Sequence, residues 1–228
     1  MLIKEIEKRL RNLKIPEFFG GNSDEDDYEW LYVWSENDEI KDLLAIPHYC
    51  AHGVSKFVFV LKEYDWVIKI PFNGSYLNCW NEKDKNYNEE WNPFNGANGW
   101  DYCNIELEKY EEAQSRGLEC FFADTRYLCS DRNYHPIYIQ EKVIPCSSDR
   151  TKRTPSNKAL ELVKNKHYFN STWVAIAIDF YGEEKVNQFL DYIMNIDPVI
   201  YEDLHDGNYG YREDGSPCLL DFSGWCED

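Results

Sequence analysis

The chain has 228 residues, 43% of them hydrophobic and 16% aromatic, which is enough apolar material to bury a sizeable core. Its formal net charge is -18. Nucleic-acid binding and docking on an anionic membrane surface both need a basic footprint, so the charge argues against both classes of partner. If the partner is a protein, a basic one suits this charge.

The cysteines and the amino-terminal segment bear on the compartment. The eight cysteines form no C-x-x-C pair and no spacing with histidine that is typical of zinc. The first residues, MLIKEIEKRLRNLKI, are charged throughout and contain no apolar signal core. No stretch approaches the roughly 18 apolar residues of a membrane span. We therefore expect a cytoplasmic protein with reduced thiols.

The amino-terminal part predicts helices and an acidic loop. Residues 2–13 form an amphipathic helix whose apolar face carries Leu2, Ile3, Ile6, Leu10 and Leu13. Residues 20–29 are rich in acidic and turn-forming residues and indicate a loop. A second, short helix is expected over 35–45, capped by its first residue, a serine. Residues 1–45 are therefore predicted to be a helical and acidic extension.

An extended pattern follows over the next residues. We expect strands over 46–53, 55–62 and 65–72, and the last two form an antiparallel hairpin. Residues 73–101 are rich in Asn, Gly and Trp and show no sustained period, which indicates a long surface insertion.

The second half of the chain mixes helices with short strands. The expected elements are a helix over 102–116 ended by Gly117, strands over 125–130 and 135–143, helices over 156–195 broken near Asn170 and Gly182, a loop over 201–208, and a hairpin of 208–211 with 218–222 turned by 212–217.

Two carboxyl-terminal segments carry groups that suit phosphate chemistry. Residues 201–208 read Y-E-D-L-H-D-G-N, and residues 219–224 read L-L-D-F-S-G. Phosphoryl transfer from ATP needs a carboxylate that receives the proton of the attacking hydroxyl, and oxygen ligands for Mg²⁺. Asp203, Asn208 and Asp221 supply such groups. The structural alternative is an acidic turn followed by a buried hairpin.

These segments resemble the catalytic loop and the metal-binding motif of the protein-kinase-like superfamily. The D-L-H-x-G-N motif is most similar to that of the aminoglycoside phosphotransferase and choline kinase branch. The resemblance implies that Asp203 is the catalytic base and that Asn208 and Asp221 bind Mg²⁺. It places His205 near the transferring phosphate, where that branch has His and protein kinases have Lys.

Other segments resemble further parts of the family in the same order. W-V-I-K-I-P-F resembles the V-A-I-K strand, so Lys69 is expected to bind the α- and β-phosphates. Its expected ion-pair partner is a glutamate of the next helix. Four acids compete for that role: Glu106, Glu108, Glu111 and Glu112. We choose Glu106, because its i+4 neighbour Tyr110 indicates that this face of the helix points toward the core. The resemblance implies that Tyr110 packs toward Phe222.

The adenine and phosphate contacts are inferred from position alone. Y-I-Q-E-K-V-I-P resembles the fifth strand and hinge of the family, which implies that adenine bonds to the backbone around Glu141 and Val143. Only Gly53 stands where the protein-kinase pattern has three glycines. The expected phosphate cover is therefore C-A-H-G-V-S, with Gly53 and the hydroxyl of Ser55.

The resemblance implies an α+β, bilobal protein-kinase-like fold with an antiparallel sheet in the N-lobe and a truncated, mainly helical C-lobe. The expected N-lobe spans 46–143 with its insertion at 73–101, and the expected C-lobe spans 144–228. Three departures affect function: Glu202 replaces the Arg of regulated protein kinases, no A-P-E motif occurs, and the helical subdomain expected after D-F-S-G is missing from these residues.

The residues together predict an ATP- and Mg²⁺-dependent phosphotransferase. It would transfer the γ-phosphate to a hydroxyl of a protein or of a small molecule, and the sequence leaves that acceptor open. Two alternatives also stay open. One is a pseudokinase-like module that binds nucleotide or a partner protein without catalysis, and the other is transfer of AMP by the same site.

Overall fold

A computed structural model gives the structure of the protein. It describes residues 2–11, 50–52, 56–61, 65–71, 80–81, 86–87, 101–130, 136–146, 153–164, 166, 170–205 and 207–224. The chain forms two compact units, the first from residues 1–107 with 125–141 and the second from 108–124 with 142–228. The predicted loop over 20–29, the predicted helix over 35–45, and Gly53 and Ser55 lie outside the described residues.

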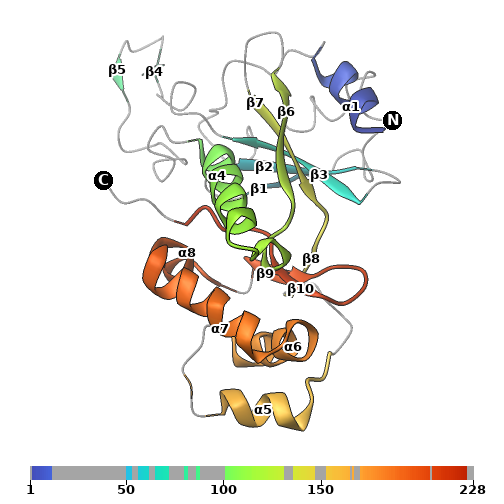
Figure 1. The fold of residues 1–228 in the computed structure, drawn as a ribbon. Coiled ribbons are helices and arrows are strands. Elements are labelled where there is room, and N and C mark those ends of the chain that lie inside the picture. The colour runs from blue at the N-terminus through green and yellow to red at the C-terminus, as the bar shows by residue number, and fades with distance from the viewer. Residues whose placement is uncertain are drawn as a thin grey trace. The chain divides into compact units, whose positions relative to one another are not determined.

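The first unit contains a five-stranded antiparallel sheet in the order β1-β2-β3-β7-β6 (Figure 1). The strands are β1 (Cys50–His52), β2 (Lys56–Val60), β3 (Trp66–Pro71), β6 (Thr125–Ser130) and β7 (Pro136–Glu141). β-Branched and aromatic residues dominate them, as a pleated, packed surface favours. The predicted strands and the β2–β3 hairpin are confirmed where described, and β7 ends two residues earlier than expected.

Helix α1 (Leu2–Leu10) packs on β6 in the first unit. Ile6 and Leu10 are fully buried on its apolar face, which confirms the predicted amphipathic helix. The helix ends at Leu10, and residues 12–13 of the predicted helix lie outside the described residues.

The predicted insertion over 73–101 contains a small two-stranded antiparallel sheet that the sequence did not indicate. Its strands are β4 (Trp80–Asn81) and β5 (Asn86–Tyr87). Strands of two residues are too short to show a period of two, so no alternation could predict them.

Helix α4 (Tyr102–Ser115) begins and ends on residues suited to each position. The Asp101 carboxylate accepts a hydrogen bond from the Asn104 amide at 2.9 Å, which caps the first turn. At the other end, the Leu118 amide donates to the Ala113 carbonyl and the Gly117 amide to the Gln114 carbonyl. This is a Schellman motif, and Gly117 takes its left-handed position with φ of 69°.

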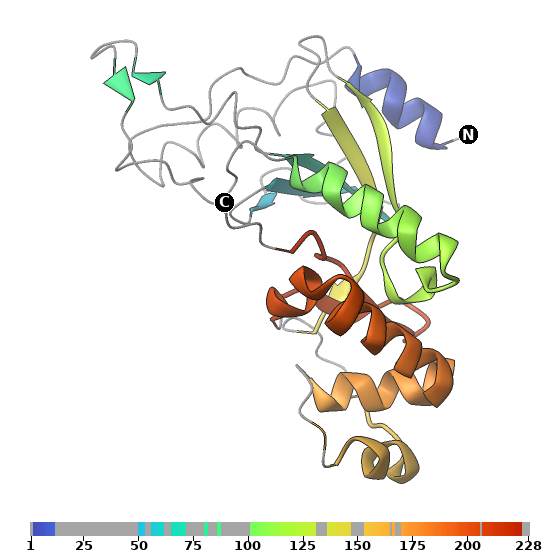
Figure 2. The ribbon, with the colours of Figure 1, turned by 60° about the vertical axis from the view of Figure 1, so that its left-hand side comes forward.

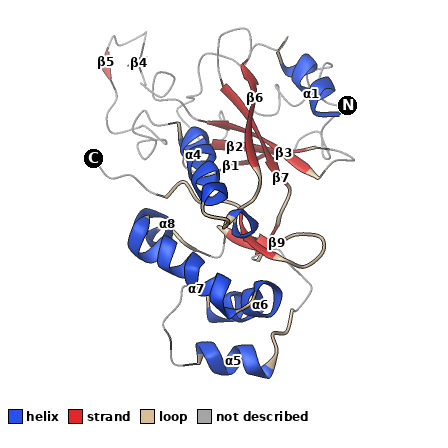
Figure 3. Ribbon diagram, in the orientation of Figure 1, coloured by secondary structure: helices blue, strands red, loops and turns tan. Residues whose placement is uncertain are grey.

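The second unit is mainly helical (Figure 3). Its helices are α5 (Asn157–Val163), α6 (Ser171–Tyr181), α7 (Glu183–Asp191) and α8 (Pro198–Glu202), with a π-helical turn at Tyr192–Ile196. α5 packs on α6 and α6 on α7 (Figure 2). Asn170 caps α6 and Gly182 separates α6 from α7, which confirms both predicted breaks.

A three-stranded antiparallel sheet completes the second unit, in the order β10-β9-β8. The predicted hairpin is confirmed as β9 (Tyr209–Tyr211) and β10 (Pro217–Leu219). β8 (Ile144–Pro145) was not predicted, and it approaches so closely that a Cβ on Gly210 would collide with the Ile144 carbonyl. The prediction of a loop over 201–208 is wrong for its first two residues, which are the last two residues of helix α8.

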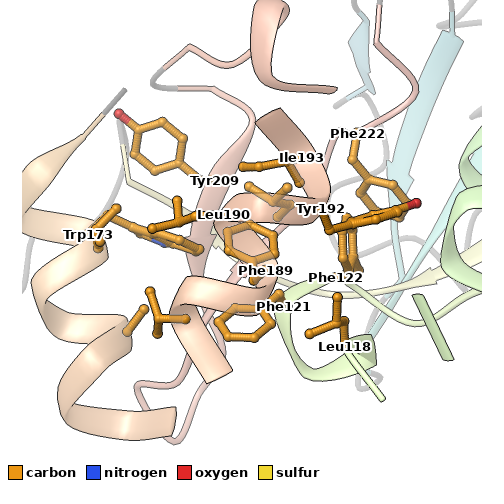
Figure 4. Packing of buried hydrophobic residues seen from close by; sticks show 14 of the residues in the cluster. Leu118, Phe121, Phe122, Trp173, Phe189, Leu190, Tyr192, Ile193, Tyr209 and Phe222 are labelled. Carbon is orange, nitrogen blue, oxygen red and sulfur yellow. The ribbon is translucent and has the colours of Figure 1, made fainter. Parts of the chain in front are cut away.

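Aromatic side chains fill the core of the second unit (Figure 4). Phe121 stacks on Phe189 with ring centroids 4.3 Å apart, and Phe122 meets Phe222 edge to face at 5.1 Å. Phe121 ends a 3₁₀ turn (Glu119–Phe121) directly after α4. The cluster therefore holds the D-F-S-G segment, through Phe222, against the end of α4.

The protein is thus α+β with antiparallel sheets, as predicted at that level. No helix in the described part of the chain is both long and apolar enough to cross a membrane.

Candidate functional site

The first unit holds a buried ion pair between Lys69 and Glu106. The Lys69 Nζ lies 2.8 Å from Glu106 Oε2, and the two side chains are 4% and 0% exposed. Lys69 comes from the middle of β3 and Glu106 from the second turn of α4. The ion pair predicted from the sequence is confirmed, including the choice of Glu106 among the four acids of the helix.

A second lysine, which the sequence analysis missed, binds the other oxygen of the same carboxylate. Lys56 Nζ lies 2.6 Å from Glu106 Oε1, and its side chain is 3% exposed. In the β2–β3 register Lys56 lies opposite Pro71 and Val58 lies opposite Lys69, so the two lysines share one face of the sheet. Folding the predicted hairpin about its turn would have revealed this neighbour.

Neutral polar side chains complete the cluster around Glu106. Gln140 of β7 donates to the Thr125 hydroxyl at 2.8 Å, and the same amide nitrogen lies 3.5 Å from Glu106 Oε2. Cys103 lies one turn before Glu106, and burial raises the pKa of its thiol well above its usual value. The thiol therefore stays neutral beside the charged side chains of Lys56, Lys69 and Glu106.

The start of α4 is fixed to the sheet by Asp101. While one carboxylate oxygen caps α4, the other accepts a hydrogen bond from the Tyr138 hydroxyl of β7 at 2.7 Å. Burial, followed by the Asp101 contact, raises the pKa of Tyr138 far above its ordinary value, so the hydroxyl keeps its proton. This contact connects the start of α4, the helix that carries Glu106, with β7.

In the second unit, Asn208 connects Asp203 with the backbone of Asp221. Asp203 ends α8, and its backbone carbonyl accepts a hydrogen bond from Asn208 Nδ2 at 2.9 Å. The same nitrogen lies 3.4 Å from Asp203 Oδ2. The Asn208 carbonyl accepts the Leu220 amide at 2.9 Å and the Asp221 amide at 3.4 Å. The structure therefore brings Asp203, Asn208 and the start of D-F-S-G together.

The side-chain amide of Asn208 has one defined orientation. A backbone carbonyl can only accept a hydrogen bond, so the nitrogen must face Asp203 and the oxygen must face the other way. Asn208 is 2% exposed, and within the described part of the chain no donor bonds to its side-chain oxygen. A buried oxygen without a donor is costly unless a ligand satisfies it, and amide oxygens suit Mg²⁺.

His205 is exposed at the middle of the loop, and its ring is oriented by the backbone. The Gly207 amide donates to His205 Nδ1 at 3.0 Å. The bond requires that Nδ1 carry no proton, so neutral His205 has its proton on Nε2. That N–H can donate to a phosphate oxygen or an acceptor group.

The end of the D-F-S-G segment packs against α8. Gly224 has φ of 75°, and a Cβ there would collide with Val199 Cγ1 and lie 2.8 Å from the Val199 carbonyl oxygen. Only glycine permits this approach. Ser223 donates to Asp221 Oδ1 at 3.5 Å, and Tyr110 belongs to the same buried cluster as Phe222. The predicted packing of Tyr110 and Phe222 into one core is confirmed.

The two residues that the resemblance places at the hinge lie at the end of β7 and just after it. Glu141 is the last residue of β7, and Val143 lies between β7 and β8 with its side chain packed against the second core. Within the described residues, neither the amide nor the carbonyl of Val143 takes part in a backbone hydrogen bond.

Histidine, cysteine and acidic residues build no cluster of three or more that could hold a metal ion, in the part of the chain that the structure describes. Asn208 and Asp221 offer a smaller set, which suits Mg²⁺ because this ion keeps several waters and phosphate oxygens. The described cysteines Cys103, Cys120, Cys129, Cys146 and Cys218 are all free thiols.

Comparisons with protein-family models, with curated proteins and with solved structures found no match for this chain.

Proposed function

We propose that this protein is an ATP-dependent phosphotransferase with a minimal protein-kinase-like fold. In this proposal the first unit corresponds to the N-lobe and the second to the truncated C-lobe. The γ-phosphate of Mg-ATP is transferred to a hydroxyl of a protein or of a small molecule.

The observation that carries the proposal is the buried ion pair between Lys69 and Glu106. The kinase-like pattern selected these residues separately, from segments 37 positions apart. Two charges removed from water cost several kcal/mol of desolvation, and apolar residues of similar size would stabilise the fold equally well. A buried lysine that is kept in spite of this desolvation cost is well suited to binding an anionic ligand, such as the phosphates of ATP.

The loop that contains Asn208 supports the metal-binding part of the proposal. Its buried side-chain oxygen has no donor among the described residues, and its backbone carbonyl binds the chain at Asp221. Asn208 Oδ1 and the Asp221 carboxylate would hold Mg²⁺. The ion would neutralise charge that develops on the phosphates during transfer.

The remaining residues supply proton transfer and positioning. Asp203 would orient the acceptor hydroxyl and receive its proton, and the Asn208 amide holds Asp203 in place for this. His205 Nε2–H would donate to the transferring phosphoryl group. Adenine would bond to the backbone of Val143, beside Glu141.

A second candidate function is nucleotide binding without transfer. It is favoured by the second lysine on Glu106, since the kinase-like pattern has a single lysine at that carboxylate. Transfer of AMP would use the same residues. The nature of the reaction product separates these functions.

The test is to incubate the purified chain with Mg-ATP and candidate acceptors and to measure all masses. A gain of one phosphoryl group supports the proposal, a gain of AMP supports nucleotidyl transfer, and no gain with intact binding supports the binding module. Binding is measured by calorimetry and by thermal unfolding, where saturation at 100 times Kd stabilises the protein by about 2.7 kcal/mol. No binding at millimolar Mg-ATP contradicts the proposed function.

A further inference from the structure

A partly buried ion pair connects α4 with the start of α8, the short helix that leads to Asp203. The Lys109 Nζ lies 2.7 Å from Asp197 Oδ2, and the two side chains are 12% and 19% exposed. Both residues belong to the second unit, although they are 88 positions apart in the chain. A pair that is largely removed from water is screened much less than a surface pair, so it holds its two segments together effectively.

The Asp197 carboxylate is directed to α4 and not to its own helix. Asp197 is the residue that precedes α8, a position at which an aspartate usually accepts a hydrogen bond from an amide of the first turn. Here its side chain caps no amide of α8, and it binds Lys109 instead. The residue at the start of α8 therefore attaches this helix to α4.

Helix α8 relays this attachment to Asp203. The helix spans only Pro198–Glu202, and Asp203 follows as its carboxyl-terminal cap. In its middle, Ile200 is buried in the core of the second unit. At the far end, the Asn208 amide binds the Asp203 carbonyl. A single helical turn that is fixed at its start, middle and end gives the residue that follows it a defined position.

We propose that Lys109 is a positioning residue of the phosphotransferase, which holds the start of α8 and thereby orients the Asp203 carboxylate toward the acceptor oxygen. This inference rests on the proposed function. In this role Lys109 contacts neither the nucleotide nor the acceptor, so it affects turnover and not the binding of Mg-ATP. Misplacing a reacting group by about 1 Å can lower a rate about 10²-fold.

The alternative is that the ion pair only stabilises the fold. A pair of that kind changes the fraction of molecules that are folded, but leaves the turnover of each folded molecule at its wild-type value. Kinetics are therefore measured well below the unfolding temperature of every variant, and rates are divided by the folded fraction given by circular dichroism.

The experiment compares the wild-type chain with Lys109→Met, Lys109→Arg, Asp197→Asn and the double variant of Lys109→Met with Asp197→Asn. The control is Lys164→Met, because Lys164 belongs to an exposed ion pair with Glu161 in the same unit. The probe is Mg-ATP with water as acceptor: the water oxygen bonds to the γ-phosphorus, its proton goes to Asp203, and ADP leaves. Release of inorganic phosphate measures this turnover.

We expect kcat of Lys109→Met to fall about ten- to hundredfold while KM for Mg-ATP changes less than about twofold. The double variant should be no slower than the slower single variant, since both changes remove one contact. Lys109→Arg should keep most of the turnover, because a guanidinium also pairs with a carboxylate. Lys164→Met should match the wild-type chain.

Hydrogen exchange with mass detection tests the attachment of α8 without any reaction. In Lys109→Met we expect faster exchange over residues 198–205 and wild-type exchange over α5, because only the first segment loses a contact. If the wild-type chain releases no phosphate, this measurement decides alone: faster exchange over 198–205 supports the inference, and unchanged exchange overturns it. Absence of Mg-ATP binding by the wild-type chain overturns the proposed function, whatever the exchange shows.

The remaining outcomes also count against the inference. Wild-type kcat per folded molecule in Lys109→Met would overturn it, and so would a rise of KM as large as the fall of kcat. If Lys109→Met does not fold, Asp197→Asn replaces it, because asparagine keeps the size of the side chain and removes only its charge. If neither variant folds, the ion pair is structural and the inference is wrong.

Discussion

At the scale of single residues, Asp203 and Asp221 both lie beside Asn208 but have different proposed roles. Asp221 would face the metal directly, so Asp221→Asn removes a negative charge from Mg²⁺ and should weaken Mg-ATP binding itself. Asp203 would act on the acceptor hydroxyl. Asp203→Asn should leave ATP affinity near wild type while turnover falls about 10²-fold or more. Calorimetry and single-turnover kinetics measure the two effects.

The opposite pattern would contradict these roles. If the two aspartates only cap turns, both changes lower the free energy of unfolding and neither separates binding from turnover. Full transfer activity in Asp203→Asn would remove Asp203 as the base and favour the binding module or AMP transfer.

Glu106 offers a second prediction at this scale, one of stability. Glu106→Gln leaves two buried lysines without their shared carboxylate, and breaking a buried pair by removing one partner costs about 3–5 kcal/mol. The control is Glu108→Gln, an exposed position two residues along the same helix, where we expect a change within about 0.5 kcal/mol. Urea unfolding measures both. Equal effects would show that the cluster contributes no more than a surface charge.

At the scale of elements, the helix ends that the sequence predicted depend on two glycines with positive φ. Gly117 and Gly182 have φ of 69° and 86°, and a Cβ on either would meet nothing within 4 Å. Substitution by alanine therefore tests backbone conformation without steric contact. Gly117→Ala should cost about 1–2 kcal/mol, the usual penalty of the left-handed region.

Gly182 has φ of 86° with ψ of 152°, a region that is essentially restricted to glycine. Gly182→Ala should therefore cost more than Gly117→Ala. Thermal and urea unfolding give the order of the two, and a reversed order would mean that the end of α6 does not depend on this conformation.

The elements that could be predicted are those with a period or a cap. β3 and α4 are examples: a run of aromatic and β-branched residues marked the strand, while Gly117 and the apolar face of Tyr110 and Ala113 marked the helix. The elements that were missed are short. α8 is a single turn, although Pro198 at its first position is a start signal that could have indicated it.

The candidate site was predictable to the same degree. Lys69, Glu106, Asn208 and Asp221 stand in motifs, so the sequence selected them. Lys56 stands in no motif. The pattern within one strand shows on which face of the sheet a side chain lies, but not which residue of the neighbouring strand lies opposite. Only the register of β2 with β3 places it beside Glu106.

At the scale of the whole molecule, the two compact units interleave along the chain. The sequence predicted a single boundary between the two lobes, at residue 143. In the structure, residues 108–124 belong to the second unit, and strands β6 and β7, which follow them in the chain, belong to the first. The change falls within α4, since Glu106 joins the polar cluster of the first unit and Tyr110 joins the core of the second. Such interleaving depends on packing and leaves no signal in composition.

The proposed function therefore makes a demand on both units. If the proposal is right, Mg-ATP should affect both Lys69 and the loop around Asn208. Hydrogen exchange with mass detection, with and without Mg-ATP, should show slower exchange over residues 56–71 and over 203–224, because bound ligand suppresses the local opening that exchange requires. α5 carries no proposed ligand contact and serves as the internal control. Protection in one unit alone, with binding shown by calorimetry, would mean that the two residue sets do not share a ligand. The phosphotransferase proposal would then be wrong, even with both sets intact.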